Sequence, residues 1–136
     1  MAAITRAQNS FGSCWSCVDD LTMPAIMVTG NRVVAEAIAR RWSTPRGGLV
    51  DDPNYGFDLT DYISDDVTQT DLGRIAALAG AEAKKDERVL SCAVTITLDL
   101  AGKLTVTGNV RTATGPFQLV LAVSQVTVAL LQVTNQ

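Results

Sequence analysis

Hydrophobic positions recur every three to four residues in two segments of the chain, and this spacing predicts two amphipathic helices. The first covers "RVVAEAIARRW"; Gly30-Asn31 marks its start, and Thr44-Pro45 ends it, because a residue before proline is pushed out of the helical region. The second begins at Thr70, a good N-cap, with Asp71 in its first turn. Its predicted buried stripe, whose alanines favour close packing against a sheet, comprises Leu72, Ile75, Ala76, Ala79 and Ala83.

After Arg88 the hydrophobic period changes to two, which is typical of half-buried strands. Turns at Ala101-Gly102 and at residues 112–116 divide this region into three strands. The positions predicted to face inward are Leu90, Cys92, Val94, Ile96, Leu98 and Leu100, then Leu104, Val106 and Val110, then Phe117, Leu119, Leu121 and Val123. The chain is therefore predicted to be α+β, with two helices packed on a small antiparallel three-stranded β-meander.

The hydrophobic parity changes near Ser124-Gln125, being odd up to Val123 and even afterwards, which requires a bulge or a break. No charged residue occurs from 117 to 136, and an uncharged edge strand invites pairing with another chain. We expect residues 124–136 to be a C-terminal interaction strand outside the sheet. Its expected contact residues are Val126, Val128 and Leu130, and the alternative is a longer ordinary core strand.

The length of 136 residues suits one domain, which we place at residues 30–136, preceded by an extended N-terminal arm over residues 1–29. A net charge of −3 argues against nucleic-acid binding. The absence of histidine excludes serine–histidine, cysteine–histidine and histidine-ligated zinc sites. The N-terminus does not resemble an export signal, and the most apolar stretch is too short and polar to span a bilayer. We expect a soluble protein made in a cytoplasm.

Cys14-Trp15-Ser16-Cys17 forms a CxxC motif, but a redox motif should follow a strand and open a helix. A zinc site would need two further ligands, and Cys92 is the one remaining cysteine. The cysteines are therefore interpreted as structural, with a redox or metal role as the alternative. We predict no metal and no cofactor.

A long loop follows the first predicted helix, and half of the fourteen acidic residues lie between Asp51 and Asp71. Glycoside hydrolysis uses two carboxylates, for which Asp52 with Asp58, or Asp58 with Asp61, would be the candidates. Aspartates before proline or at helix starts are, however, common turn and cap residues, and "DLTDYI" indicates one short capped helical turn. We therefore predict no catalytic residue and no enzymatic activity.

The planar guanidinium of Arg46 can bond several acceptors at once. We expect it to lock this loop internally, onto Asp51, Asp52 or Asp58. The residues predicted to structure the loop are Thr44, Pro45, Arg46, Gly47, Asp52, Pro53, Tyr55, Gly56 and Asp58.

The order "AIARRWSTPRGGLVDDPNYGFDLTDYI", then a helix, then "DERV" before a strand resembles the W-like baseplate wedge family of contractile phage tails, also called sheath initiators. The resemblance covers roughly residues 30–123, and its specific elements are Thr-Pro-Arg-Gly and Asp-Pro-Asn-Tyr-Gly-Phe-Asp-Leu. The chain departs from the family pattern in two places. Trp42 replaces the usual leucine, and the Asp86-Glu87-Arg88 triplet lacks the proline between acid and arginine.

The resemblance implies a structural protein of the virion tail baseplate, assembled in the host cytoplasm, with six copies per baseplate. Its expected partners are the tail sheath protein and other wedge and hub proteins, and it would template the first ring of sheath. Asp86, Glu87 and Arg88 are expected to dock onto wedge partners, the alternative being a solvated charge cluster at a helix end. The other functions considered are an adaptor in another contractile injection machine and a peptidoglycan hydrolase, since some members carry a lysozyme label.

Overall fold

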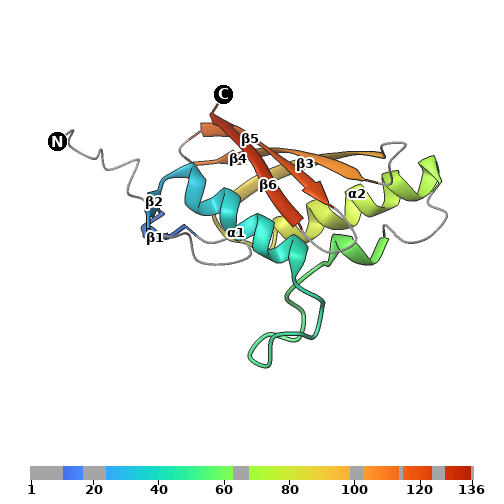
Figure 1. Ribbon diagram of the computed structural model, residues 1–136, viewed down its shortest axis with the longest axis horizontal. Coiled ribbons are helices and arrows are strands. Elements are labelled where there is room, and N and C mark those ends of the chain that lie inside the picture. The colour runs from blue at the N-terminus through green and yellow to red at the C-terminus, as the bar shows by residue number, and fades with distance from the viewer. Residues whose placement is uncertain are drawn as a thin grey trace.

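Two helices lie on one side of an antiparallel sheet in the computed structural model, which describes residues 11–16, 24–62, 68–98, 103–113, 115–123 and 128–135 (Figure 1). The elements in chain order are β1 (Ser13–Trp15), β2 (Met27–Thr29), α1 (Asn31–Ser43), the 3-10 turn η1 (Leu59–Tyr62), α2 (Gln69–Ala83), β3 (Val89–Leu98), β4 (Leu104–Thr112), β5 (Gly115–Val123) and β6 (Val128–Asn135). The main sheet has the order β3-β4-β5-β6, and β1 and β2 form a separate two-stranded ribbon. The predicted α+β class is confirmed, and β3, β4 and β5 are the predicted meander.

The ends of the helices follow their capping residues. Helix α1 starts after Gly30, whose φ of 65° favours glycine, and ends before Thr44 in extended conformation, as predicted. Helix α2 begins two residues earlier than expected, since its N-cap is Thr68 and not Thr70. The Thr68 hydroxyl accepts from the backbone N–H of Asp71 at 3.3 Å, and the Asp71 carboxylate accepts from the N–H of Thr68 at 3.2 Å. This capping box satisfies two backbone donors, which Thr70 would not.

Trp42 is the largest fully buried side chain and joins both helices to the sheet. Its indole N–H donates to the backbone oxygen of Ala79 on α2 at 3.0 Å. The indole ring reaches β4 opposite Gly108, where an added Cβ would lie 3.3 Å from the Trp42 ring. The inward positions predicted for β4 and β5 are all buried: Leu104, Val106, Val110, Phe117, Leu119, Leu121 and Val123.

Strand β3 departs from the predicted alternation at its ends. Leu90 was expected to face inward but is 60% exposed, because a register shift between Val89 and Ser91 makes it the extra residue of a β-bulge. Val89 is buried in its place. Leu98, also predicted inward, is 42% exposed at the last position of the strand. Leu100 lies outside the described residues.

Helix α2 packs closely against β3, as its small residues predicted. A Cβ added at Gly80 would lie 3.3 Å from the backbone oxygen of Cys92. The small residues of α2 therefore allow the helix to approach the edge of the sheet.

Residues 128–135 are part of the sheet, so the expectation that the C-terminal segment stays outside it is wrong for these residues. Strand β6 pairs antiparallel with β5, with Val128 opposite Val123 and Leu130 opposite Leu121. A register shift then places Val133 opposite Leu119, and Val133 packs against the core. The parity change is thus accommodated by pairing the segment as a further strand. The predicted break at Ser124-Gln125 lies outside the described residues, and so does the predicted contact residue Val126.

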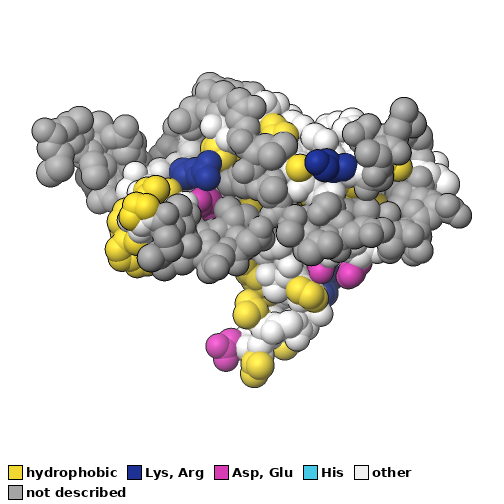
Figure 2. Space-filling view, in the orientation of Figure 1, with side chains coloured by type: hydrophobic (Ala, Val, Ile, Leu, Met, Phe, Trp, Pro, Cys, Tyr) yellow, Lys and Arg dark blue, Asp and Glu magenta, His cyan; other side chains and the backbone are white. Residues whose placement is uncertain are grey.

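The described parts of the N-terminal arm are extended but paired with each other. Ser13 lies opposite Thr29 in the β1–β2 ribbon, with Trp15 opposite Met27. The Ser16 hydroxyl donates to the fully buried Glu36 carboxylate of α1 at 2.8 Å, which ties the ribbon to the domain. Hydrophobic side chains gather on the outer surface at this end of the molecule (Figure 2).

Candidate functional site

The loop between α1 and η1 projects away from the rest of the domain (Figure 1). Its outgoing half turns immediately after the helix. The Thr44 hydroxyl donates to the backbone oxygen of Arg40 at 2.6 Å, and the Gly48 N–H donates to the Pro45 oxygen at 3.0 Å. Gly47 within this turn has a φ of 87°, a conformation that favours glycine.

The returning half of the loop is built from the Asp52-Pro53-Asn54-Tyr55 turn. The Asp52 carboxylate accepts from the N–H of Asn54 at 3.2 Å, and its backbone oxygen accepts from the N–H of Tyr55 at 3.1 Å. This is the local aspartate turn that the sequence predicts.

A fully buried carboxylate, Glu82 of α2, holds the base of the loop. Its Oε1 accepts from the Gly56 N–H at 2.8 Å and from Arg41 at 3.2 Å. Its Oε2 accepts from Lys85 Nζ at 2.7 Å and from Arg46 at 3.1 Å. We call this group of five residues the Glu82 clamp. Because its members come from α1, the loop and the end of α2, one side chain fixes three segments of the chain.

Arg46 locks the loop internally, as predicted, but through a different acceptor. Its Nε donates to the Gly56 oxygen at 3.2 Å, and its terminal nitrogen binds Glu82. The sequence predicted one of three loop aspartates as its partner: Asp51, Asp52 or Asp58. Those side chains are short, and Asp52 and Asp58 bond within local turns, whereas Glu82 reaches the loop from α2. The signal that could have found Glu82 is its position three residues after Ala79, which places it on the buried face of the helix.

Further contacts pin the returning half of the loop to both helices. The Arg41 guanidinium lies 4.4 Å from the centre of the Tyr55 ring, a cation–π distance. The Phe57 N–H donates to the Arg41 oxygen at 2.8 Å, and Lys85 Nζ donates to the Asn54 oxygen at 2.8 Å. The loop is therefore held along its return path as well as at its base.

Gly56 is required where the two halves of the loop meet. Its φ is 106°, and a Cβ at this position would overlap the backbone oxygen of Thr44 and lie 3.1 Å from that of Pro45. A side chain here would push the two halves apart and remove the Gly56 N–H from Glu82.

The pKa of Glu82 lies below its ordinary value of 4.5. Burial acts to raise this pKa, but hydrogen bonds from Lys85 and Gly56, with the positive charge of Lys85 and a hydrogen bond from Arg41, outweigh it. The clamp therefore holds Glu82 in its charged form at neutral pH.

The tip of the loop presents hydrophobic side chains to solvent. Val50 is 96% exposed and Leu49 is 44% exposed, and the adjacent Asp51 and Asp52 are exposed as well. Figure 2 shows hydrophobic and acidic side chains together at this projecting end of the molecule. The loop thus combines a base fixed by the Glu82 clamp with a tip that exposes both apolar and acidic side chains.

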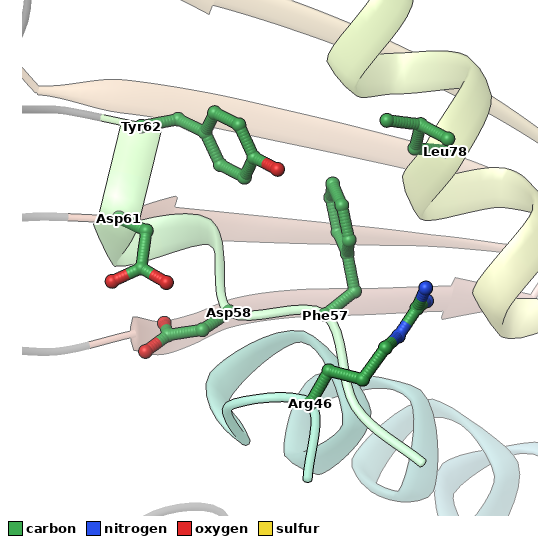
Figure 3. Close-up of a pocket in the computed structure, with 6 residues that line it drawn as sticks. All are labelled: Arg46, Phe57, Asp58, Asp61, Tyr62 and Leu78. Atoms are coloured by element: carbon green, nitrogen blue, oxygen red, sulfur yellow. The ribbon is translucent and has the colours of Figure 1, made fainter. Parts of the chain in front are cut away.

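A cavity of about 230 Å³ lies at the foot of the loop beside η1 (Figure 3). The rings of Phe57 and Tyr62 stack within it, with centroids 5.4 Å apart. Asp58 caps η1, because its Oδ1 accepts from the Thr60 N–H at 3.0 Å and from the Thr60 hydroxyl at 2.7 Å. The cavity is lined by Arg46, Phe57, Asp58, Asp61, Tyr62 and Leu78.

The structure brings together one of the two carboxylate pairs considered for hydrolysis. Asp58 and Asp61 line the same cavity, whereas Asp52 lies in the turn nearer the tip. One oxygen of Asp58 is already committed to capping η1, as the pattern "DLTDYI" predicted.

The Asp86-Glu87-Arg88 triplet forms the turn between α2 and β3. Arg88 donates its backbone N–H and its Nε to Asp86 Oδ1 at 3.0 and 2.9 Å, and a terminal nitrogen to Oδ2 at 2.7 Å. Asp86 is buried, while Glu87 is exposed. Asp86 is therefore not a solvated acid, whereas the Arg88 side chain is 30% exposed; docking by the triplet stays a prediction.

The cysteines within the described residues are free thiols, Cys14 in β1 and Cys92 in β3, and Cys17 lies outside those residues. Burial raises the pKa of Cys92 to about 11, which disfavours its reactive thiolate. Over the described ranges no group of three or more histidine, cysteine or acidic side chains could hold a metal ion. No helix in the described part of the chain is long and apolar enough to cross a membrane.

A scan of the chain against models of known protein families finds no match, and neither does a search of curated proteins.

Proposed function

We propose that this chain is a structural baseplate component of a contractile phage tail, which joins the wedge ring and templates the first ring of sheath. The observation that carries the proposal is the loop between α1 and η1: the Glu82 clamp fixes its base, and its tip exposes Leu49 and Val50.

A loop of this construction suits protein binding. Fixing a loop before association removes much of the entropic cost of ordering it in the complex. Burying an exposed aliphatic side chain against a partner contributes favourable binding free energy, and the polar residues around it give the contact its specificity. Val50 with neighbouring Asp51 and Asp52 has this arrangement.

The residues that carry the family resemblance are also the residues that build the loop. Arg46 and Gly56 meet at Glu82, and Asp52 and Asp58 cap the local turns. These contacts set the shape of the loop. A shaped loop supports a structural role in an assembly.

The edge of the sheet supports the templating part of the proposal. Over the described residues β6 pairs with β5 alone, so its outer edge is the end of the sheet. An extended segment of sheath protein could add to this edge through backbone hydrogen bonds. Val128 and Leu130 lie in β6 and remain the predicted contact residues for sheath, together with Val126.

The proposal is tested in the virus that encodes this chain. Tails are purified from wild-type virus and from a mutant lacking the gene, analysed by mass spectrometry, and imaged by electron microscopy. We expect the chain in wild-type tails and baseplates without sheath in the mutant, with sheath restored by a plasmid copy. Absence of the chain from purified tails, or normal sheaths in the mutant, would overturn the proposal.

A further inference from the structure

We infer that the cavity beside η1 binds an arginine side chain of a partner protein. The inference deepens the proposed function, because it states the chemistry of a surface that docks against this loop. It rests on the shape of the cavity, the nature of its walls and the distribution of charge around it.

The cavity has the size of a site for one side chain. Its volume of about 230 Å³ lies below the roughly 300–1,000 Å³ usual for small-molecule sites. Its walls come from different elements, with Phe57 in the loop before η1, Tyr62 at the end of η1 and Leu78 on α2. Leu78 is partly exposed and Tyr62 half-buried, so an aliphatic stem entering the cavity would cover apolar surface.

The charge available to an occupant is negative. The side chain of Asp61 forms no hydrogen bond within the described part of the chain, and of the two carboxylate oxygens of Asp58 only Oδ1 is engaged, by Thr60. Arg46 also lines the cavity, but its guanidinium is held by Gly56 and Glu82. Figure 3 shows this guanidinium pointing toward α2, away from the two carboxylates. Arg46 therefore presents mainly its stem to the cavity, and the carboxylates favour a cation.

Aromatic walls beside carboxylates suit a guanidinium better than an ammonium. A guanidinium is flat and weakly hydrated, stacks on aromatic faces, and can bond two carboxylate oxygens at once. The half-buried ring of Tyr62, backed by the buried ring of Phe57 that stacks on it, and the carboxylates of Asp58 and Asp61 provide both kinds of contact. The occupant is thus an arginine on a basic protein surface.

The test uses the purified full-length chain, labelled with ¹⁵N, and N-acetyl-L-arginine methylamide as the probe in NMR titrations at low ionic strength. We expect saturable shifts of the amide signals of Phe57, Asp58, Asp61 and Tyr62. The citrulline analogue, which has the same shape without the charge, should cause none. The lysine analogue should bind more weakly than arginine.

Substitution separates the cavity from general acidity of the loop. Asp61→Asn should weaken arginine binding by about two- to fivefold, the usual size of an exposed ion pair. Asp51→Asn removes the same charge at the loop tip and should leave binding unchanged. Because the Asp61 side chain is exposed and makes no hydrogen bond in the described structure, this variant is expected to fold normally.

Several results would overturn the inference. They are an absence of shifts around η1, equal shifts with citrulline, equal affinity for lysine, or equal weakening by both asparagine substitutions. A chain that assembles into tails without binding arginine would refute this inference alone. A chain that binds arginine but is absent from tails would refute the proposed function alone.

Discussion

At the scale of single residues, Glu82 determines the shape of the loop. Burying a carboxylate without partners is costly, but this one accepts hydrogen bonds from Gly56, Arg41, Arg46 and Lys85. Removing its charge would leave three cationic side chains close together around an acceptor of reduced strength. The position of the whole loop therefore depends on one side chain of α2.

Glu82→Gln should lower the free energy of unfolding by about 2–4 kcal/mol at pH 7. This loss is somewhat smaller than for a wholly buried ion pair, because Arg46 and Lys85 are partly exposed. Chemical denaturation measures the change. Glu87→Gln, an exposed change a few residues away, should stay within about 0.5 kcal/mol. Equal stability of the two variants would contradict the importance of the clamp.

The same residue gives the protein a defined response to acid. The pKa values of Glu82 and Asp86 are lowered in the folded state from 4.5 and 3.8. A lowered pKa adds stability that is complete above the unfolded value and is lost as the pH falls through the folded value. Stability should therefore be level from pH 7 to about 5 and fall below pH 4.5. Urea denaturation across this range should show a shallower fall for Glu82→Gln.

At the scale of elements, Trp42 and Gly108 determine how α1 sits on the sheet. The indole ring occupies the space above Gly108, which also borders Leu119 of β5. The large Trp42 ring is thus accommodated by the absence of a side chain at this position of β4.

Gly108→Ala should lower the free energy of unfolding by about 1–3 kcal/mol, because its Cβ would crowd Trp42 at 3.3 Å and Leu119 at 3.4 Å. Trp42→Leu should lower the free energy of unfolding less in the Gly108→Ala variant than in the wild type, and a double-mutant cycle measures this difference. Gly73→Ala is the matched control, since it adds a methyl group in open space on a helix and should stabilise by about 0.5–1 kcal/mol. Additive effects of the first two changes would contradict the contact.

Elements with regular periodicity could be predicted from the sequence, and those set by distant contacts could not. Alternation identified the large apolar inward residues of β4 and β5, though not the buried Gly108 and Thr112, and Pro45 located the end of α1. The bulge that exposes Leu90 leaves no periodic signal. Val89 and Leu90 are both apolar, so the sequence does not show which of the two side chains faces inward. In the site, Asp52 and Asp58 were recognised as turn and cap residues because their bonds are local. Glu82 was missed because its partners are far away in sequence.

At the scale of the whole molecule, β6 completes the sheet that the helices cover. It pairs with β5 along most of its length, and Val133 contributes to the core. The segment is thus both part of the fold and the edge at which a further strand could be added. A structural role and a binding role are compatible, because pairing uses opposite edges of the same strand.

Deleting residues 126–136 should strongly destabilise the domain, since it removes the backbone partners of β5 along one of its two edges and the apolar contact of Val133. Circular dichroism should show a large drop in the melting temperature or loss of the cooperative transition. Val133→Ala, which keeps the strand, should cost about 1–2 kcal/mol at this partly buried site. A truncated chain with wild-type stability would show that β6 contributes nothing to the core.

The central claim, that the clamped loop docks this chain into a baseplate, is tested most directly by the amount of chain in purified tails when the loop tip is changed. Leu49→Ser/Val50→Ser should leave stability unchanged, because both side chains are exposed, and should reduce incorporation at least tenfold. Leu90→Ser, an exposed leucine on β3, should be incorporated like the wild type. Normal incorporation of the loop-tip variant, with sheathed tails, would contradict the account.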